Sequence, residues 1–570
     1  MSPTPAAQRA DRAPIAADAF LRGLADHGVD YFFCNPGTDF PPIVEAFARA
    51  KQTNAKVPRP MVIPHENLAV AMAHGVYLMT GRPQAVMVHV NVGTANTINN
   101  ITNMSRERAP VILAAGRTPI SEKGTFGARN RSIHWAQEMF DQAGMLRELV
   151  KWDYELRTPN QIADVVSRAF EVAMTSPRGP VYLVLPREPL AAPLAEPPGP
   201  LKPRPVPPPP HPDPRSIATL ADWIAAAERP LIICASAEAE VMTALARIAE
   251  RCAIPVISPG ARALCLPSNH PMFLGGEPGA LLAEADLVIV IESDAPWMAS
   301  LQHPPVGCRV ANIGEDPNYV RYPMRSFPND LAIKSDAATA LSALDEAVAG
   351  KLAKSEGRIA ARRARIGERS RTRHAQLAKD TSPSGDKISR GYLNRVLGEV
   401  VGPDAIVFNE YPLNFDHCPR EKPGTFFSLS PAGGLGWGLG AALGAKLVKP
   451  DKLVVAAVGD GAYMFTNPTV CHWVAGVFDL PVLTVICNNS LYQAVRGATM
   501  SMFKDGAAGE EDCRGLANLD PSPPFEQLAQ AQGAHAERVE RPDQLAAALT
   551  RARDAVVEEG KQAVVNVICP

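Results

Sequence analysis

Two strand-like runs that end in polar clusters constrain this chain more than any other feature. The segment from Lys452 to Asn489 is KLVVAAVGDGAYMFTNPTVCHWVAGVFDLPVLTVICNN. One β-branched run ends at Gly459-Asp460-Gly461, a helix-length segment follows, and a second run ends at Asn488-Asn489, 28 residues after the aspartate. The pattern predicts a β-α-β unit whose polar clusters meet at the carboxyl ends of two parallel strands, where open sheets bind ligands.

The residue types in these clusters suit a magnesium ion that holds a diphosphate. A carboxylate and a carboxamide supply hard oxygen ligands, so we predict Asp460 and Asn489 as metal ligands and the carbonyl of Leu491 as a third. Gly461 and Ala462 would donate backbone N–H groups to phosphate at the start of the next helix. The alternative is a buried turn that Asp460 caps.

Bulk properties exclude several classes of protein. The 570 residues carry 57 basic and 59 acidic side chains, and a net charge of −2 gives no electrostatic reason to bind nucleic acid or an anionic membrane. The ten cysteines form no Cys-x-x-Cys pair. No apolar run approaches the roughly 18 residues of a membrane span, and the N-terminus lacks the apolar core of a signal peptide. We therefore expect a cytoplasmic enzyme with reduced thiols.

Alternating strand-like and helix-like segments predict an α/β fold of three doubly wound parallel-sheet domains. Proline is too dense between the first two blocks for helix or sheet, which predicts a stiff spacer. We expect a disordered leader (1–15), a first domain (16–190), a proline-rich linker (191–215), a middle domain (216–350), a charged connector helix (351–386) and a third domain (387–570). The first and third blocks look like two copies of one architecture.

Three further segments carry residues that suit chemistry. Glu66 follows a strand at a helix start, where a carboxylate usually just compensates the helix dipole. His89 ends another strand before a glycine turn, where a lone histidine is more often structural. The glycine-rich segment 430–447 leads into a helix; it is either a close-packed helix–strand junction or a surface that presents Gly433 and Leu435 to a flat heteroaromatic cofactor.

Together these pieces resemble the thiamine diphosphate-dependent decarboxylase superfamily, which includes acetohydroxyacid synthase, benzoylformate decarboxylase and pyruvate decarboxylase. The resemblance extends from CNPGTDF at residues 34–40 to QAVVNVI near the C-terminus. It implies a pyrimidine-binding, a middle and a diphosphate-binding domain, in that order. It also implies a homodimer or homotetramer, because such enzymes bind each cofactor between the first domain of one subunit and the third of another.

The resemblance assigns roles residue by residue. Glu66 matches the acid that contacts the aminopyrimidine ring and activates the cofactor, since a desolvated carboxylate can share a proton with a ring nitrogen. Leu435 matches the apolar residue that supports the bent cofactor, and the carbonyl of Gly433 matches the acceptor for its amino group. The metal site matches Asp460, Asn489 and Leu491, and the other cofactor contacts match Gly459, Gly461, Ala462, Tyr492 and Gln493.

The motifs resemble two different subfamilies. His89 precedes Gly-Thr-x-Asn as in benzoylformate decarboxylase, and Thr38 occupies the place of a serine whose hydroxyl contacts the substrate carboxylate. Gln137 instead resembles a glutamine near the reacting centre of acetohydroxyacid synthase. The middle block lacks the flavin-site pattern of that enzyme, so bound FAD is not expected. Whether His303 or the charged segment 493–516, a possible lid, enters the active site stays open.

These expectations describe a thiamine diphosphate- and Mg²⁺-dependent lyase or acyloin-forming transferase that acts on a 2-oxo acid or a related 2-hydroxy-carbonyl compound. His89 is expected to relay protons, and Gln137 and Thr38 to contact substrate. Decarboxylase and acetolactate synthase-like carboligase remain open, as does a 2-hydroxyacyl-CoA lyase or oxalyl-CoA decarboxylase-like enzyme. A cofactor-binding scaffold without catalysis and a plain nucleotide-binding protein are the alternatives from other classes.

Overall fold

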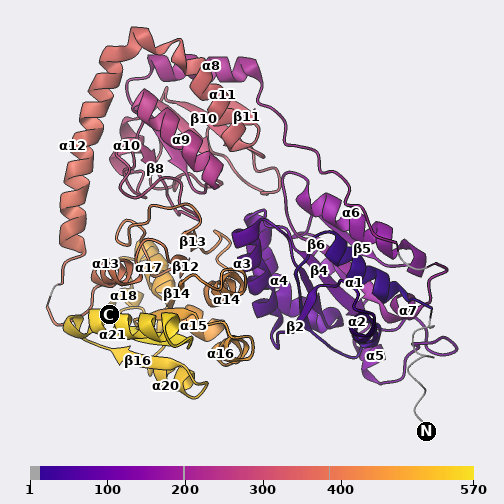
Figure 1. Cartoon of the computed structure of the whole chain (residues 1–570). Helices are drawn as coiled ribbons and strands as arrows, with labels where there is room; N and C mark the ends of the chain where they lie inside the picture. Colours follow the sequence, from indigo (N-terminus) through magenta and orange to yellow (C-terminus); the bar gives the residue numbers. More distant parts are fainter. Residues whose placement is uncertain (1–12, 197–198, 384, 570) are drawn as a thin grey trace. The chain divides into compact units, whose positions relative to one another are not determined.

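The computed structural model describes residues 13–196, 199–383 and 385–569 (Figure 1). Most of the expected leader therefore lies outside the described residues. The chain forms two compact units. The first contains the residues up to 207 together with 430–450 and 464–480, and the second contains 208–429, 451–463 and 481–570. The predicted domain bounds stay predictions.

The first unit contains a six-stranded parallel sheet with the order β2-β1-β3-β4-β6-β5. Its strands are β1 (Tyr31–Asn35), β2 (Arg59–Val62), β3 (Ala85–Val88), β4 (Ile112–Arg117), β5 (Trp152–Glu155) and β6 (Val181–Pro186). β3 and β6 are buried along their whole length, as expected for strands covered on both faces. The half-buried strand β5 at the edge was not predicted.

Helices cover both faces of this sheet. α1 (Ala16–Asp26), α2 (Pro41–Thr53), α6 (Ile162–Met174) and α7 (Arg187–Ala191) share one core with the strands, which includes Phe20, Phe32, Ile43 and Phe170. α3 (Glu66–Thr80) and α4 (Val90–Arg106) pack together outside that core. The predicted doubly wound arrangement is therefore confirmed for this sheet.

Within the same unit, α3 packs closely against α14 (Gly438–Val448). A Cβ atom at Gly75 would lie 2.0 Å from the carbonyl oxygen of Ala441, and one at Gly444 would lie 2.0 Å from that of Met72. Because only glycine leaves room for this approach, the glycines on both helices explain the contact. The glycine-rich segment thus includes a close-packed junction, but it joins two helices and not a helix and a strand as expected.

The second unit contains two parallel sheets. The five-stranded sheet has the order β11-β10-β9-β7-β8, and the six-stranded sheet has the order β13-β12-β14-β15-β17-β16. The latter order, counted along the chain, repeats that of the first unit's sheet, so the expected two copies of one architecture are confirmed. The strands are β7 (Pro230–Cys234), β8 (Val256–Ile257), β9 (Leu287–Ile291), β10 (Arg309–Gly314), β11 (Leu331–Lys334), β12 (Ile406–Glu410), β13 (Phe426–Ser428), β14 (Val454–Gly459), β15 (Leu483–Asn488), β16 (His535–Val539) and β17 (Ala563–Ile568).

The principal helices of this unit accompany the two sheets in chain order. They are α8 (Pro214–Ala226), α9 (Ala239–Cys252), α10 (Gly279–Glu284), α11 (Ala337–Ala349), α12 (Glu356–Asp380), α13 (Arg390–Val401), α17 (Gln493–Met502), α20 (Phe525–Gln530) and α21 (Pro542–Val557). Between β14 and β15 lie α15 (Asp460–Phe465) and α16 (Pro468–Val477), the latter in the first unit. The predicted single helix is therefore broken. Asn467 has φ +57° and Pro468 starts a new helix, which explains the break.

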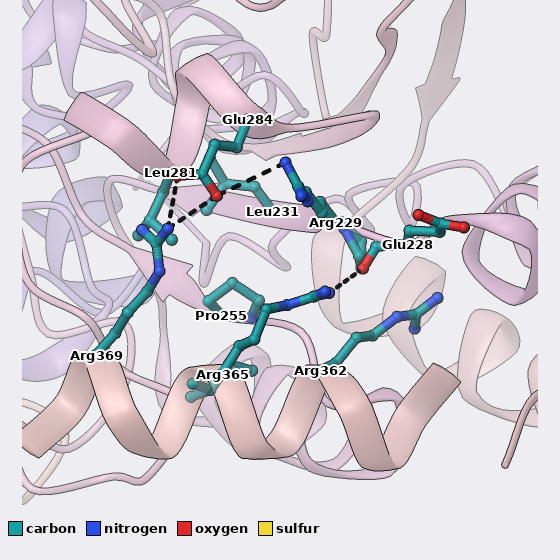
Figure 2. A pocket seen from close by; sticks show the side chains of 11 residues that line it. Glu228, Arg229, Leu231, Pro255, Leu281, Glu284, Arg362, Arg365 and Arg369 are labelled. Carbon is teal, nitrogen blue, oxygen red and sulfur yellow. Dashed lines mark hydrogen bonds and ion pairs between the residues drawn. The ribbon is translucent and has the colours of Figure 1, made fainter. Parts of the chain in front are cut away.

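The charged connector is the long helix α12, and arginines attach it to the five-stranded sheet's domain. The buried guanidinium of Arg362 donates to the carbonyl oxygens of Cys252 at 2.9 Å and Ile224 at 2.8 Å. Figure 2 shows the next turns of the helix, where Arg365 donates to the Glu228 carbonyl and Arg369 pairs with Glu284 at 2.7 Å. Two of these arginines bind backbone carbonyl groups and the third binds a carboxylate, so α12 is fixed to the domain along several turns.

Three further observations bear on the sequence predictions. Among the residues that the structure describes, no helix combines the length and the apolarity needed to cross a membrane. All ten cysteines are free. The segment 493–516 begins with helix α17 and continues into the short α18 (Ala507–Glu510) and α19 (Arg514–Ala517), and its role as a lid stays a prediction.

Candidate functional site

Glu66 is the first residue of α3, and its carboxylate is 8% exposed. Asn35, at the end of β1, donates its side-chain amide to Oε1 at 2.8 Å. Asn96 on α4 donates to Oε2 at 3.1 Å. A Cβ atom at Gly93 would lie 3.3 Å from Oε1, so the lack of a side chain at Gly93 leaves room for the carboxylate. Two neutral amides therefore fix the orientation of Glu66.

His89 lies between β3 and α4, where its backbone caps the helix. Its Nδ1 lies 2.5 Å from Oδ1 of Asp39, a carboxylate that is 3% exposed. The hydrogen bond with Asp39 raises the pKa of His89 above its usual value, while burial opposes the rise. The expected glycine turn after His89 is wrong. Helix α4 begins at Val90 and Gly93 lies in its first turn, because the Asp39 carboxylate accepts the Val90 N–H at 3.3 Å and supports the helix start.

Gln137 contacts the same histidine, and Thr38 contacts a second one, His134. The Thr38 hydroxyl lies 3.4 Å from Nε2 of His134, whose Nδ1 accepts the backbone N–H of Asn130 at 3.3 Å. His134 therefore carries its proton on Nε2 and donates it to Thr38. Burial and the charges of nearby arginines lower the pKa of His134. The Gln137 side chain helps to raise the pKa of His89, and its Oε1 is buried without a well-formed hydrogen bond among the described residues.

The structure thus groups Thr38, Glu66, His89 and Gln137 in the first unit, as the sequence analysis expected of a common site. Both Glu66 and Gln137 raise the pKa of His89. The hydroxyl of Thr38 contacts His134, whose pKa His89 helps to lower. Sequence reasoning did not assign Asp39 or Asn96 a role. Asn96 lies in the quoted Gly-Thr-x-Asn pattern, so its type and position could have identified it.

The loop that contains Gly433 and Leu435 belongs to the same unit. The Asn99 amide donates to the Leu435 carbonyl at 2.7 Å. Asn103 donates to the Gly434 carbonyl at 2.8 Å and accepts the Gly434 N–H at 3.0 Å. Gly433 has φ +68°, which favours glycine. Helix α4 therefore holds this loop through two asparagines that sequence reasoning missed, although the run NTINNITN at 96–103 is unusually rich in amides.

Asp460 and Asn489 lie at the carboxyl ends of the adjacent parallel strands β14 and β15, as predicted. Asp460 is 3% exposed; its Oδ1 accepts the Gly461 N–H at 2.9 Å, and its buried Oδ2 has no well-formed hydrogen bond among the described residues. Burial raises the pKa of Asp460, and backbone N–H groups at Ser490 and Leu491 oppose the rise. The aspartate and the loop after β15 are therefore brought together.

The donor set here suits magnesium. Asn489 Oδ1 accepts the Leu491 N–H at 3.1 Å, and the Leu491 carbonyl accepts the Gln493 N–H at 2.9 Å, which leaves each oxygen a second lone pair. Within the described ranges, no three His, Cys, Asp or Glu side chains gather as a metal-binding group. The Asp460 oxygen that lacks a well-formed hydrogen bond within the described residues, together with amide and carbonyl oxygens, nonetheless fits a hard cation that keeps several of its own waters.

The residues near Asp460 that are predicted to contact the cofactor differ in how much space surrounds them. A Cβ atom at Gly461 would lie 2.5 Å from the Tyr492 ring, so the tyrosine covers that glycine. Gly459 has open space where a side chain would be. Tyr492 is held by a hydrogen bond from its N–H to the Ala517 carbonyl at 2.8 Å, and Gln493 begins α17. His303 is exposed on the second unit, with its Nδ1 3.3 Å from the Pro304 carbonyl oxygen.

Comparison with known proteins gives a consistent family. Models of the thiamine pyrophosphate enzyme N-terminal, central and C-terminal TPP-binding domains match residues 15–145, 217–344 and 413–567. Benzoylformate decarboxylase of Pseudomonas aeruginosa is 26% identical over 493 residues, which cover 83% of this chain and 85% of that protein. A probable acetolactate synthase large subunit of Methanocaldococcus jannaschii is 25% identical over 559 residues, 93% of this chain and 88% of the relative.

Solved structures agree on the fold. The thiamine diphosphate-dependent 4-hydroxybenzoylformate decarboxylase of Rhodococcus jostii superposes with a TM-score of 0.78 at 20% identity, covering 98% of this chain and 99% of that one. Benzoylformate decarboxylase from Polynucleobacter necessarius gives a TM-score of 0.77 at 21% identity, over 97% and 98% of the two chains. With three consecutive domain models matched in order and the same fold throughout, the chain belongs to the thiamine pyrophosphate enzyme family.

Proposed function

We propose that this protein is a thiamine diphosphate- and Mg²⁺-dependent enzyme that breaks or forms a C–C bond next to the carbonyl of a 2-oxo acid or related 2-hydroxy-carbonyl compound. The observation that carries the proposal is the buried Glu66 carboxylate, which two amides orient beside His89 in a chain of this family. A scaffold without catalysis would have no need of an acid held in this way.

The residues at the ends of β14 and β15 would hold the cofactor's diphosphate. Asp460, Asn489 and the Leu491 carbonyl would bind Mg²⁺, and the ion would bind phosphate oxygens. The buried Asp460 oxygen that has no well-formed hydrogen bond among the described residues supports this assignment, because burying such a group costs free energy unless a cation or donor pairs with it. Gly459, Gly461 and Ala462 lie at or next to the start of α15, where backbone N–H groups and the helix dipole favour an anion.

The residues of the first unit would act on the rings and on the substrate. When bound, the thiazolium ring of thiamine diphosphate accepts the electron pair released as the C–C bond breaks. Glu66 would hold a proton against the pyrimidine ring, Leu435 would support the cofactor, and the Gly433 carbonyl would accept a hydrogen bond from it. Thr38, which accepts from His134, keeps its own O–H to donate to a substrate carboxylate.

Decarboxylation and carboligation are both represented among the relatives. Benzoylformate decarboxylase and a probable 2-ketoarginine decarboxylase of Pseudomonas aeruginosa favour the former, and acetolactate synthase favours the latter. We favour the decarboxylase, since an imidazole whose pKa is raised by a carboxylate is protonated to a larger extent at neutral pH and so has a proton to donate. The protein is also proposed to be a homodimer or homotetramer, a state that light scattering on the purified chain would measure.

A substrate screen tests the proposed function. Purified protein with thiamine diphosphate and Mg²⁺ is incubated with pyruvate, benzoylformate, longer 2-oxo acids and oxalyl- or 2-hydroxyacyl-CoA thioesters, and CO₂, aldehyde and acyloin are measured. We expect CO₂ and aldehyde from at least one 2-oxo acid. Glu66→Gln should lose this turnover, whereas Glu45→Gln, at an exposed carboxylate on α2, should keep it.

The same preparation discriminates the other classes of protein. Thermal stabilisation by thiamine diphosphate with Mg²⁺, and none by ATP or NAD, is expected. Stabilisation by thiamine diphosphate without turnover of any substrate would favour a scaffold and reject the enzyme. Stabilisation by ATP or NAD alone would reject thiamine diphosphate as the cofactor.

A further inference from the structure

A cavity of about 40 Å³ lies between α12 and the amino-terminal edge of the five-stranded sheet (Figure 2). β7 begins at Pro230 and β8 at Val256, and the cavity lies beside these strand starts. Open parallel sheets bind their ligands at the opposite edge, where the strands end. The cavity is therefore on a different sheet, and at a different edge, from Asp460 and Asn489. Its charged lining residues are Glu228, Arg229, Glu284, Arg362, Arg365 and Arg369.

The most buried of these arginines has an unused donor. Arg362 is 2% exposed. Its two Nη atoms donate to the carbonyl oxygens of Cys252, Ile224 and Ala227, whereas its buried Nε has no hydrogen-bond acceptor among the described residues. The charge of Asp286 acts on Arg362, but within the described ranges Arg362 forms no ion pair. Because a guanidinium keeps its proton in proteins, this buried charge lacks a counter-ion in contact with it.

The other arginines add to the positive charge around the cavity. Figure 2 shows Arg362, Arg365 and Arg369 projecting from successive turns of α12 towards the segment that contains Arg229. Arg365 donates to a backbone carbonyl and pairs with no carboxylate in the described part of the chain. Arg229 lies 4.0 Å from Glu284, whose two oxygens already accept from Arg369 at 2.7 and 2.8 Å. The wall thus contains four guanidinium groups and two carboxylates, which favours an anion.

The electrostatics of Arg362 agree with this excess of positive charge. Burial lowers the pKa of Arg362, and the charges of Arg358 and Arg365 lower it further, while Cys252 and Asp286 oppose the shift. An anion in the cavity would supply both an acceptor for Nε and the missing negative charge. The volume holds about three waters, which matches one tetrahedral oxyanion and is too small for a nucleotide.

We propose that this cavity binds a free tetrahedral oxyanion of the phosphate class, which Arg362, Arg365 and Arg229 hold beside the first residues of β7. Arginine suits this ligand, because guanidinium groups form charge-assisted hydrogen bonds with phosphate oxygens. The site is independent of the proposed function. Since α12 leads from the domain of the five-stranded sheet to that of the six-stranded sheet, the bound ion strengthens the attachment of this connector helix.

Titration calorimetry with inorganic phosphate tests the site, with chloride at the same ionic strength as the reference. The protein is kept saturated with thiamine diphosphate and Mg²⁺, so that the ion does not occupy the candidate diphosphate site. We expect one saturable phosphate per chain. Arg365→Gln and Arg229→Gln should each weaken binding about 10-fold or more, since each removes charged donors. Arg371→Gln is the matched control, because Arg371 is an exposed arginine of α12 outside the cavity wall, and it should bind phosphate as the wild type does.

Hydrogen exchange gives a second readout that needs no variant. Phosphate should slow exchange of the backbone amides at 362–369 about threefold or more relative to chloride, while the amides of α21 stay unchanged. Absence of saturable phosphate binding to the wild type would overturn the proposal. Binding to Arg365→Gln and Arg229→Gln as tight as to the wild type would show an adventitious ion only, bound elsewhere, and would overturn it as well.

Discussion

The contact between α3 and α14 contains a histidine that should make the protein sensitive to acid. His74 on α3 is 2% exposed, and its Nδ1 accepts the indole N–H of Trp437 at 3.0 Å. The two rings lie 5.8 Å apart between centroids. Burial lowers the pKa of His74 from 6.5 to about 3. The ring is therefore neutral in the folded protein throughout the physiological range.

The sign and size of the effect follow from the two pKa values. The unfolded chain takes up a proton on this ring near pH 6.5, whereas the folded chain does so only near pH 3. The stabilisation is thus complete above pH 6.5 and decreases as the pH falls towards 3. Between pH 8 and pH 5 the loss is about 2 kcal/mol, which corresponds to about a 30-fold change in the opening equilibrium.

Hydrogen exchange of the backbone amides of α3 measures this pH-dependent loss of stability in the helix that contains His74. After correction for intrinsic exchange rates, the opening free energy of α3 should fall by about 2 kcal/mol more in the wild type than in His74→Gln between pH 8 and pH 5. Glutamine offers an oxygen to the Trp437 N–H but does not titrate. His303→Gln, at an exposed histidine, is the control and should behave as the wild type. Equal pH dependence in the wild type and His74→Gln would refute the reasoning.

Three further substitutions test the site and its support. Glu66→Gln should leave thiamine diphosphate binding within about threefold but slow H/D exchange at its C2 by about 100-fold or more, since the amide cannot exchange a proton with the ring; unchanged exchange would reject the role of Glu66. Asp460→Ala should abolish Mg²⁺-dependent retention of the cofactor, and an unaltered dissociation constant in titration calorimetry would reject the metal site. Gly75→Ala should lower the free energy of unfolding by about 1–3 kcal/mol, because its methyl would meet the Ala441 carbonyl, whereas Gly497→Ala, in open space on α17, should not destabilise the protein; denaturant titration compares them.

The parts of the fold that local sequence determines were predicted correctly. The β-branched runs of β14 and β15, the polar residues that end them and the helix that begins at Glu66 are each encoded within a few neighbouring residues. By contrast, β5 was missed because all four of its residues are half-buried, which removes the alternation that marks a strand. The break between α15 and α16 was missed although Asn467-Pro468 is a turn-like pair, since the flanking apolar pattern continues through it.

The sequence predicted only those residues of the candidate site whose type and local position already suggest a chemical role. Glu66, His89 and Asp460 could be singled out from strand ends and helix starts. Asp39 could not, because 50 residues separate it from His89 and nothing in the sequence fixes the alignment of the two loops. The same holds for Asn103, whose partner Gly434 is 331 residues away. Such contacts depend on the packing of whole elements, which local patterns do not encode.

The groups that hold the two titratable residues differ in charge, and this difference suits their proposed tasks. Glu66 is oriented by the neutral amides of Asn35 and Asn96, whereas His89 is held by the charged Asp39. A lysine or arginine in place of either asparagine would pair with the carboxylate and favour its ionised form, which would hinder a group that must both take up and release a proton. A neutral residue in place of Asp39 would fail to favour the protonated imidazole. Amides therefore fix the position of Glu66 without placing a charge beside it, and a carboxylate fixes the position of His89 and raises its pKa.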